Sequence, residues 1–309
     1  MTAVEPAGDA AAPASATPSI AGARPWFDTP NVRRVVVLAA IVGLVLGIET
    51  VVFHLRTDPM ADLHAYVDAA ARLNGGQPLY DQPASVDDPA FYRYPPLLAI
   101  AFRPFAALPF DVIAIGWTVV LLTSLAVTVL RLGARRRETW LVMAMLALPT
   151  GWAMVIGQAQ VVVTLLVALG NPLAIALATN VKVFPALVAI WWIGRRDLRG
   201  LGWFAAWMAA LVLVQLVIEP AATLAYPAFL LSDQVGAVNN YSPYAISPIL
   251  WAALVAALAL GAWRLAPKRL GWPLAVALSV FATPRLLIYQ LSTLVAGLRA
   301  PNESPEERP

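Results

Sequence analysis

The stretch Val35–Leu55, VVVLAAIVGLVLGIETVVFHL, decides the fold class of this chain. A helix that crosses a bilayer needs roughly 20 apolar residues, and this run supplies them directly after Arg33 and Arg34. Further apolar runs follow at Pro95–Pro109, Val112–Leu132, Trp140–Ile156, Ala159–Gly170, Pro172–Val181, Phe184–Ile193, Leu201–Ile218, Tyr244–Leu265 and Gly271–Gly297. Several are too short to cross a hydrocarbon core of about 30 Å while upright, which indicates helices that line a site. The sequence predicts an all-α polytopic membrane protein with a bundle of about nine to eleven transmembrane helices.

The composition agrees with a membrane protein. Of 309 residues, 60% are hydrophobic and 13% are charged, whereas soluble domains average roughly 25% charged residues. We expect one transmembrane domain at residues 31–298, between a disordered cytoplasmic tail at 1–30 and a disordered C-terminal tail at 299–309. The chain has no cysteine and two histidines, which excludes disulfides, thiolate metal sites and a multi-histidine centre. No metal or other cofactor is predicted, and the dispersed basic residues do not predict nucleic-acid binding.

The charges predict an orientation. Arginine and lysine cluster at residues 131–137, 195–199 and 264–269, whereas residues 56–94 hold six acids and three arginines. Basic loops favour the cytoplasm, so we expect the N-terminus inside and loop 56–94 outside. One conflict remains, because two apolar runs lie between this loop and the cluster at 131–137. Either Pro95–Pro109 does not cross the membrane, or that cluster breaks the charge rule.

The loop at residues 56–94 carries the first candidate site. Apolar residues recur at helical spacing from Ala61 to Leu73, which predicts an amphipathic helix lying along the membrane surface, ended by Asn74-Gly75-Gly76. Asp62 lies in its first turn, where a carboxylate can simply stabilise the helix N-terminus. Alternatively, a carboxylate at the boundary of water and lipid can reach both a lipid-phosphate donor and an acceptor. Asp62 is therefore the candidate catalytic residue.

Polar residues within the apolar runs supply further candidates. Lys182 lies far from the arginine clusters and is followed by the helix breaker Pro185. A lysine centred in a membrane helix costs roughly 2.5–3.5 kcal/mol, so it marks a functional site unless it reaches the membrane surface from a helix end. Gln158 and Gln160, after Gly157, form either a polar turn or a pair of hydrogen-bonding groups for sugar hydroxyls. Arg93 is either a flanking residue at the membrane surface or a phosphate ligand.

Two more segments share this ambiguity. Asn240 lies in Asn239-Asn240-Tyr241-Ser242-Pro243-Tyr244, which is either a helix cap or a second polar wall of the site. Arg285 follows Pro284 inside the last apolar stretch and is another candidate buried cation.

The ordered motifs resemble glycosyltransferase family 87, the polyprenyl-phosphate-sugar-dependent mannosyltransferases of the GT-C class. The resemblance covers roughly residues 30–245. The matching residues are Asp62, Tyr66, Gly76, Tyr80, Tyr94-Pro95-Pro96-Leu97, Gly157-Gln158 and Lys182-Val183-Phe184-Pro185.

The resemblance implies an inverting transfer of a sugar, mannose or a related one, from a polyprenyl-phosphate donor to an acceptor hydroxyl outside the cytoplasm. Asp62 falls where the family places its catalytic aspartate and would act as general base. A fixed cation would stabilise the departing lipid phosphate, with Lys182 first and Arg93 and Arg285 behind it. The expected substrate-binding residues are His64, Tyr66, Tyr80, Tyr94, Gln158, Gln160 and Asn240.

The implied partners are the lipid-linked sugar donor, the bilayer, and a glycolipid, polysaccharide or protein acceptor of the cell envelope. Two alternatives remain open at this point. The chain could be a carrier or flippase for a lipid-linked or small polar solute, with Lys182 in the translocation site and Asp62 only capping its helix. It could also be an inactive relative that serves as a membrane scaffold.

Overall fold

The computed structural model describes residues 29–82, 85–231 and 238–301, and these residues form helices without any strand. The elements are α1 (Pro30–Thr57), α2 (Ala61–Asn74), α3 (Pro96–Phe102), α4 (Phe110–Leu132), α5 (Arg137–Met145), α6 (Ala147–Val155), α7 (Gln160–Leu169), α8 (Pro172–Val181), the 3-10 helix η1 (Phe184–Ala189), α9 (Ile190–Arg195), α10 (Leu198–Ile218), α11 (Pro220–Leu231), α12 (Pro243–Ile246), α13 (Pro248–Arg264), α14 (Gly271–Phe281) and the 3-10 helix η2 (Ile288–Leu298). The predicted all-α membrane fold is confirmed. The expected tails at 1–30 and 299–309 fall almost entirely outside the described residues.

Three helices, α1, α4 and α10, are each long and apolar enough to cross a membrane. The helices α5 and α6 meet this test together, but the chain bends by 67° between them. Seven shorter apolar helices, of 10–17 residues each, complete the apolar part of the described chain. They include α7 and α8, which Gly170 and the Asn171 cap separate. The predicted number of membrane crossings stays a prediction.

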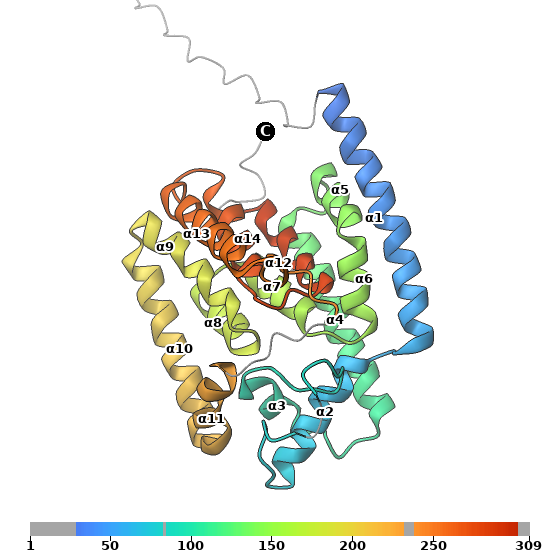
Figure 1. Cartoon of the computed structure of the whole chain (residues 1–309), viewed down its shortest axis with the longest axis vertical. Coiled ribbons are helices and arrows are strands. Elements are labelled where there is room, and N and C mark those ends of the chain that lie inside the picture. The colour runs from blue at the N-terminus through green and yellow to red at the C-terminus, as the bar shows by residue number, and fades with distance from the viewer. Residues whose placement is uncertain (1–28, 83–84, 232–237, 302–309) are drawn as a thin grey trace, which may run out of the picture.

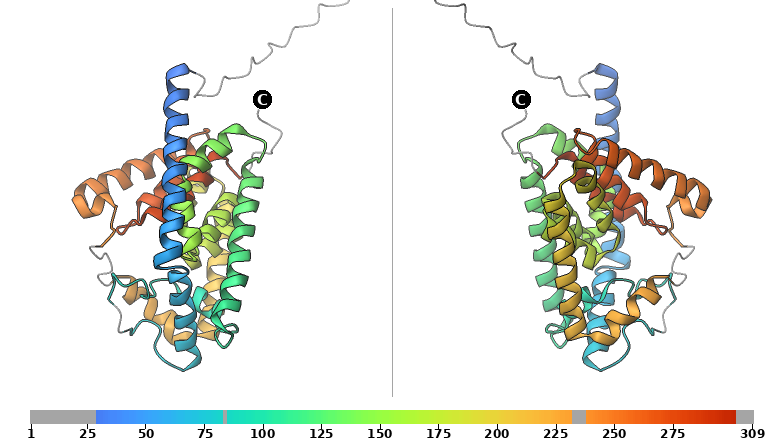
Figure 2. Two further views of the ribbon diagram at one scale, coloured as in Figure 1. Left: turned by 90° about the vertical axis from the view of Figure 1, so that its right-hand side faces the viewer. Right: turned by 90° about the vertical axis from the view of Figure 1, so that its left-hand side faces the viewer.

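The short helix α3 bears on the two alternatives that the charge pattern left open. It has seven residues, a length of about 10 Å, so it cannot cross a hydrocarbon core of about 30 Å. Helices α2, α3 and α11 lie at one end of the molecule, and α4 rises from that end towards the end where α1 begins (Figures 1 and 2). The arginine cluster at 131–137 thus lies at the end of the molecule where α1 begins. This arrangement favours the alternative in which Pro95–Pro109 does not cross, and the membrane topology stays a prediction.

Helix α1 packs closely on the bend between α5 and α6. Gly43 and Gly47 meet the backbone of this bend so tightly that a Cβ atom on Gly43 would lie 2.5 Å from the Ala144 carbonyl oxygen. Gly151 of α6 approaches α1 in the same way, since a Cβ there would lie 2.8 Å from a methyl carbon of Val51. Small residues let helix backbones approach in a membrane, so this contact fixes α6 against α1.

The end of the molecule that holds α2, α3 and α11 has its own small core. Helix α2 forms at the residues where the amphipathic helix was predicted. Its buried apolar side chains are Leu63, Ala65, Tyr66, Ala69, Ala70 and Leu73. These side chains pack with Leu79, Tyr92, Leu98 and Phe102 of the following loop and α3. Helix α11 also lies here, in a segment that is absent from the apolar runs predicted from the sequence. Its apolar run is short and contains Pro227, which hid the helix.

The arrangement of the two ends can be tested by cysteine labelling, because the chain has no cysteine of its own. Gln77 lies exposed just after α2, and Arg135 lies exposed between α4 and α5. We expect Gln77→Cys to react with a membrane-impermeant maleimide in intact cells and Arg135→Cys to react only after permeabilisation. Labelling of both from one side would contradict the placement of the two ends, whereas a reversed pattern would contradict the orientation alone.

Candidate active site

The site begins where the end of α6 meets the start of α2. Gly157 has φ +72°, and the backbone N–H groups of Gly157 and Gln158 bond to Met154 and Ala153, which is a Schellman ending of α6. The next carbonyls of α6 are free of helical partners. They accept the N–H groups that start α2, Met60 to Val155 at 2.9 Å and Asp62 to Ile156 at 2.9 Å. One junction thus positions both Asp62 and Gln158.

The carboxylate of Asp62 bonds to side chains from distant parts of the chain. Its Oδ2 accepts a hydrogen bond from Gln158 Nε2 at 3.0 Å, and its Oδ1 lies 3.5 Å from the hydroxyl of Tyr94. The cap position of α2 is held by Met60, and no side-chain capping bond is formed there. Asp62 lies in the first turn of α2, where its charge can stabilise the helix N-terminus, and its carboxylate also contacts Gln158 and Tyr94.

Gln158 is the centre of this polar cluster and is fully buried. Its Oε1 accepts from the Tyr66 hydroxyl at 2.8 Å, and its Nε2 donates to the Tyr94 hydroxyl at 3.0 Å as well as to Asp62. The Tyr66 hydroxyl in turn accepts from the N–H of Ala159 at 3.1 Å. Four of the predicted site residues, Asp62, Tyr66, Tyr94 and Gln158, are thus in direct contact.

Lys182 lies on the other side of Tyr94. It ends α8 in an extended conformation, and its ammonium lies 5.4 Å from the centroid of the Tyr94 ring and 4.8 Å from that of Tyr289. Its Nζ donates to Gln160 Oε1 at 2.7 Å. Aromatic faces and an amide oxygen both stabilise an ammonium away from water. Tyr94 therefore contacts both Asp62 and Lys182.

A small polar pocket lies beside Lys182. It is lined by Gln160, Val163, Lys182, Phe184, Pro185, Ser279, Val280, Thr283, Gln290 and Thr293, and has room for about 20 Å³, enough for an ordered water. Asp62 is not among these lining residues. The pocket combines one cation with amides, hydroxyls and apolar walls.

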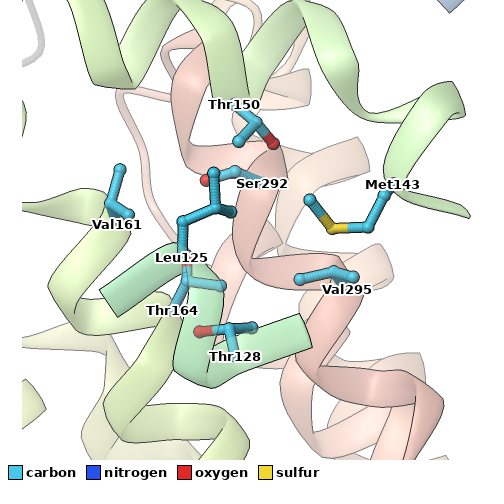
Figure 3. A pocket seen from close by; sticks show the side chains of 8 residues that line it. All are labelled: Leu125, Thr128, Met143, Thr150, Val161, Thr164, Ser292 and Val295. Carbon is cyan, nitrogen blue, oxygen red and sulfur yellow. The ribbon is translucent and has the colours of Figure 1, made fainter. Parts of the chain in front are cut away.

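A second pocket lies between α4, α5, α6, α7 and η2 (Figure 3). Its eight lining side chains are Leu125, Thr128, Met143, Thr150, Val161, Thr164, Ser292 and Val295, none of which is charged. The hydroxyls of Thr128, Thr164 and Ser292 bond to carbonyls of their own helices. This pocket therefore offers much less to a phosphate than the pocket at Lys182.

The two predicted arginines meet at one carbonyl of the outer loop. Arg93 Nη2 and Arg285 Nη1 donate to the Val86 carbonyl at 3.0 and 2.6 Å, and Arg285 also pairs with Asp87 at 2.8 Å. The charge of Arg93 acts on both Asp62 and Lys182. Arg285 keeps a buried Nε without a partner. The arginines thus extend the cationic side of the site while they hold the loop.

The remaining predicted residues have other contacts. The Tyr80 hydroxyl donates to the Tyr94 carbonyl at 3.0 Å, so Tyr80 supports the loop beneath the site. His64 is exposed and stacks on Phe110, with ring centroids 3.6 Å apart. Asn240 bonds to the backbone of Pro284, Ser242 and Leu286 and so joins two loop segments, whereas Ser242 caps α12. No contact of the described residues joins His64 or Asn240 to the Asp62 cluster.

The sequence analysis missed the contribution of η2. The ring of Tyr289 makes a cation–π contact with the ammonium of Lys182. The hydroxyl of Thr293 accepts a hydrogen bond from Gln160 Nε2 at 2.6 Å. The signal was present, because Pro284 breaks the last apolar run and Tyr289-Gln290 follow within it. A polar residue after such a break faces protein more readily than lipid.

Burial sets the proton affinity of the carboxylate. It raises the pKa of Asp62 from 3.8 to about 6, while the positive charges of Lys182 and Arg93 and the hydrogen bonds from Gln158 and Tyr94 act in the opposite direction. The same burial raises the pKa of the Tyr94 hydroxyl above its usual value. At neutral pH the site therefore holds an ionised carboxylate of raised basicity beside a neutral tyrosine.

Comparison with known proteins identifies the family of the chain. The chain matches the model of glycosyltransferase family 87 over residues 91–298 and belongs to this family. The matched span contains Tyr94, Gln158 and Lys182 and begins after Asp62. No solved structure matches the chain.

Two curated mycobacterial proteins are similar to the chain. Both are named polyprenol-phosphate-mannose-dependent alpha-(1-2)-phosphatidylinositol pentamannoside mannosyltransferase. The protein of Mycolicibacterium smegmatis is 30% identical over 257 residues, which cover 70% of this chain and 63% of the relative. That of Mycobacterium tuberculosis is 30% identical over 207 residues, which cover 60% and 47%. The chain thus spans less than two thirds of the length of either relative.

The junction of α6 and α2 makes a prediction for Gly157. A Cβ atom there would lie 3.0 Å from both Leu63 Cβ and Met60 Sδ, and the positive φ is strained for any other residue. We expect Gly157→Ala to lower the free energy of unfolding in detergent by about 1–3 kcal/mol. The control is Gly116→Ala in α4, where nothing lies within 4 Å of the added atom. Equal stability of the two variants would show that the junction tolerates a side chain.

Proposed function

We propose that this protein transfers mannose, or a related sugar, from a polyprenyl-phosphate donor to an acceptor hydroxyl on the outer side of the membrane. The observation that carries the proposal is the meeting of Asp62 and Lys182 on either side of Tyr94. Family membership and the names of the two relatives support the same reaction. A glycolipid is the acceptor class that those names favour.

In the proposed reaction Asp62 acts as general base. Its carboxylate takes the proton of the acceptor hydroxyl while that oxygen bonds to the anomeric carbon of the donor sugar. The bond between this carbon and the phosphate oxygen breaks with inversion, and the polyprenyl phosphate leaves with the bonding electron pair. Gln158 holds the carboxylate in place through Oδ2, which leaves Oδ1 and the half-buried face of Asp62 for the acceptor.

The leaving phosphate requires a positive charge and no proton. Lys182 supplies it at the rim of the polar pocket, where Gln160 fixes its ammonium. Arg93 and Arg285 add positive charge from the loop side, close to Val86. Val163, Phe184 and Val280 also line this pocket and give it apolar walls beside the cation.

Replacement of the proposed base tests the function directly. Asp62→Asn keeps the size of the side chain and removes its basicity, so we expect kcat to fall by about 10²- to 10⁴-fold with unchanged expression. The measurement is transfer of labelled mannose from polyprenyl-phosphate-mannose by the purified chain. Asp68→Asn, an exposed carboxylate on the same helix, is the matched control and should retain full turnover.

Three results would contradict this function in different ways. Full turnover by Asp62→Asn would remove Asp62 as the base. Movement of the donor across vesicles without transfer would favour a carrier. Absence of both activities in the unmodified chain would favour a scaffold.

The raised pKa of Asp62 gives the reaction a pH dependence. Only the ionised carboxylate accepts a proton, so kcat/KM should fall as pH decreases through about 6, tenfold for each further pH unit. The positive charge of Lys182 lowers the pKa of Asp62, so Lys182→Met should move this midpoint to higher pH. A profile that stays flat down to pH 5 would falsify the assignment of Asp62 as the base.

A further inference from the structure

Helix α10 carries one unusual residue. Among its 21 residues, Gln215 alone is buried, and it is 2% exposed. The other side chains of α10 lie at least partly on the surface, as expected of a helix that faces lipid. An amide turned inward from such a helix needs hydrogen-bond partners, because unsatisfied polar groups are costly in a membrane interior.

Gln215 finds its partners on two different elements. Its Oε1 accepts the N–H of Leu97 at 3.1 Å, and its Nε2 donates to Asn180 Oδ1 at 2.7 Å. Leu97 is the second residue of α3, so its N–H is one of the unpaired donors of a helix start. Asn180 is also buried, near the end of α8.

In the sequence, both partners lie within three residues of a residue of the candidate active site. Leu97 follows Tyr94 across the rigid Pro95-Pro96 pair, and Asn180 precedes Lys182 by two residues. The bridge Leu97–Gln215–Asn180 therefore ties the segment that carries Tyr94 to the segment that carries Lys182. The ammonium of Lys182 lies 5.4 Å from the Tyr94 ring centroid. This distance depends on the relative position of the two segments.

We propose that Gln215 is a positioning residue, which holds Lys182 against Tyr94 and Asp62 through Asn180 and Leu97. This rests on the proposed function, in which Lys182 stabilises the leaving phosphate. Gln215 itself touches no reacting group. Its effect on the rate passes through the placement of the cation.

The first test replaces the amide by a side chain of similar length. Gln215→Met cannot form the bridge, and we expect kcat/KM for polyprenyl-phosphate-mannose to fall about 10- to 100-fold, the effect of a small misplacement. Thr128→Val is the control, because Thr128 is buried and bonds only within α4. It should retain the activity of the unmodified chain. Full activity of Gln215→Met would overturn the proposal.

A double-mutant cycle separates positioning from general stabilisation. If Gln215 acts through Lys182, then Gln215→Met should cause no further loss in a Lys182→Met background. A purely structural role would lower the residual activity again by the same factor, and that result would overturn the proposal. Full activity of Lys182→Met alone would instead refute the proposed role of Lys182 in the reaction.

Asn180→Leu breaks the bridge from the other side and leaves the bonds from Gln215 to Leu97 and Leu211 intact. It should reproduce the loss seen with Gln215→Met and the same lack of effect in the Lys182→Met background. If neither single variant folds, the bridge serves stability and the positioning role is overturned.

Discussion

The site depends on a backbone junction, where the last carbonyls of α6 receive the first N–H groups of α2. Helix ends leave such groups without partners, and each end here satisfies the other. Because Gly157 turns the chain immediately after α6, the same junction delivers Gln158 to the carboxylate of Asp62. The close contact of α1 with the bend before α6 fixes the position of α6 and so supports this junction.

Much of the fold could be predicted from hydrophobicity and helix breakers. The run Pro172–Val181 has the bounds of α8, and the expected surface helix differs from α2 by one residue. Apolar length alone did not separate α5 from α6, although Pro149 follows their 67° bend and has no N–H to donate to the Met145 carbonyl. Nor did it reveal that α3 has only seven residues, because a seven-residue helix followed by turns has the same composition as a crossing segment.

The site was predictable in its residues and less so in its contacts. Buried polar groups in a membrane are expensive, so Lys182 and Gln158 stood out in the sequence. Which groups satisfy them depends on tertiary packing over long separations, as with Tyr289 and Lys182. Gln215 escaped notice for this reason, because one amide in an apolar helix gives no sign of its partners. His64 and Asn240 were chosen from position alone, and their contacts lie elsewhere.

The anchoring of α2 by main-chain atoms has an evolutionary consequence. Peptide groups are the same in every amino acid, so the bonds from Met60 and Asp62 to α6 survive any mutation that keeps the local backbone. The exposed face of α2 and the loop after it can therefore diversify while the carboxylate stays in place.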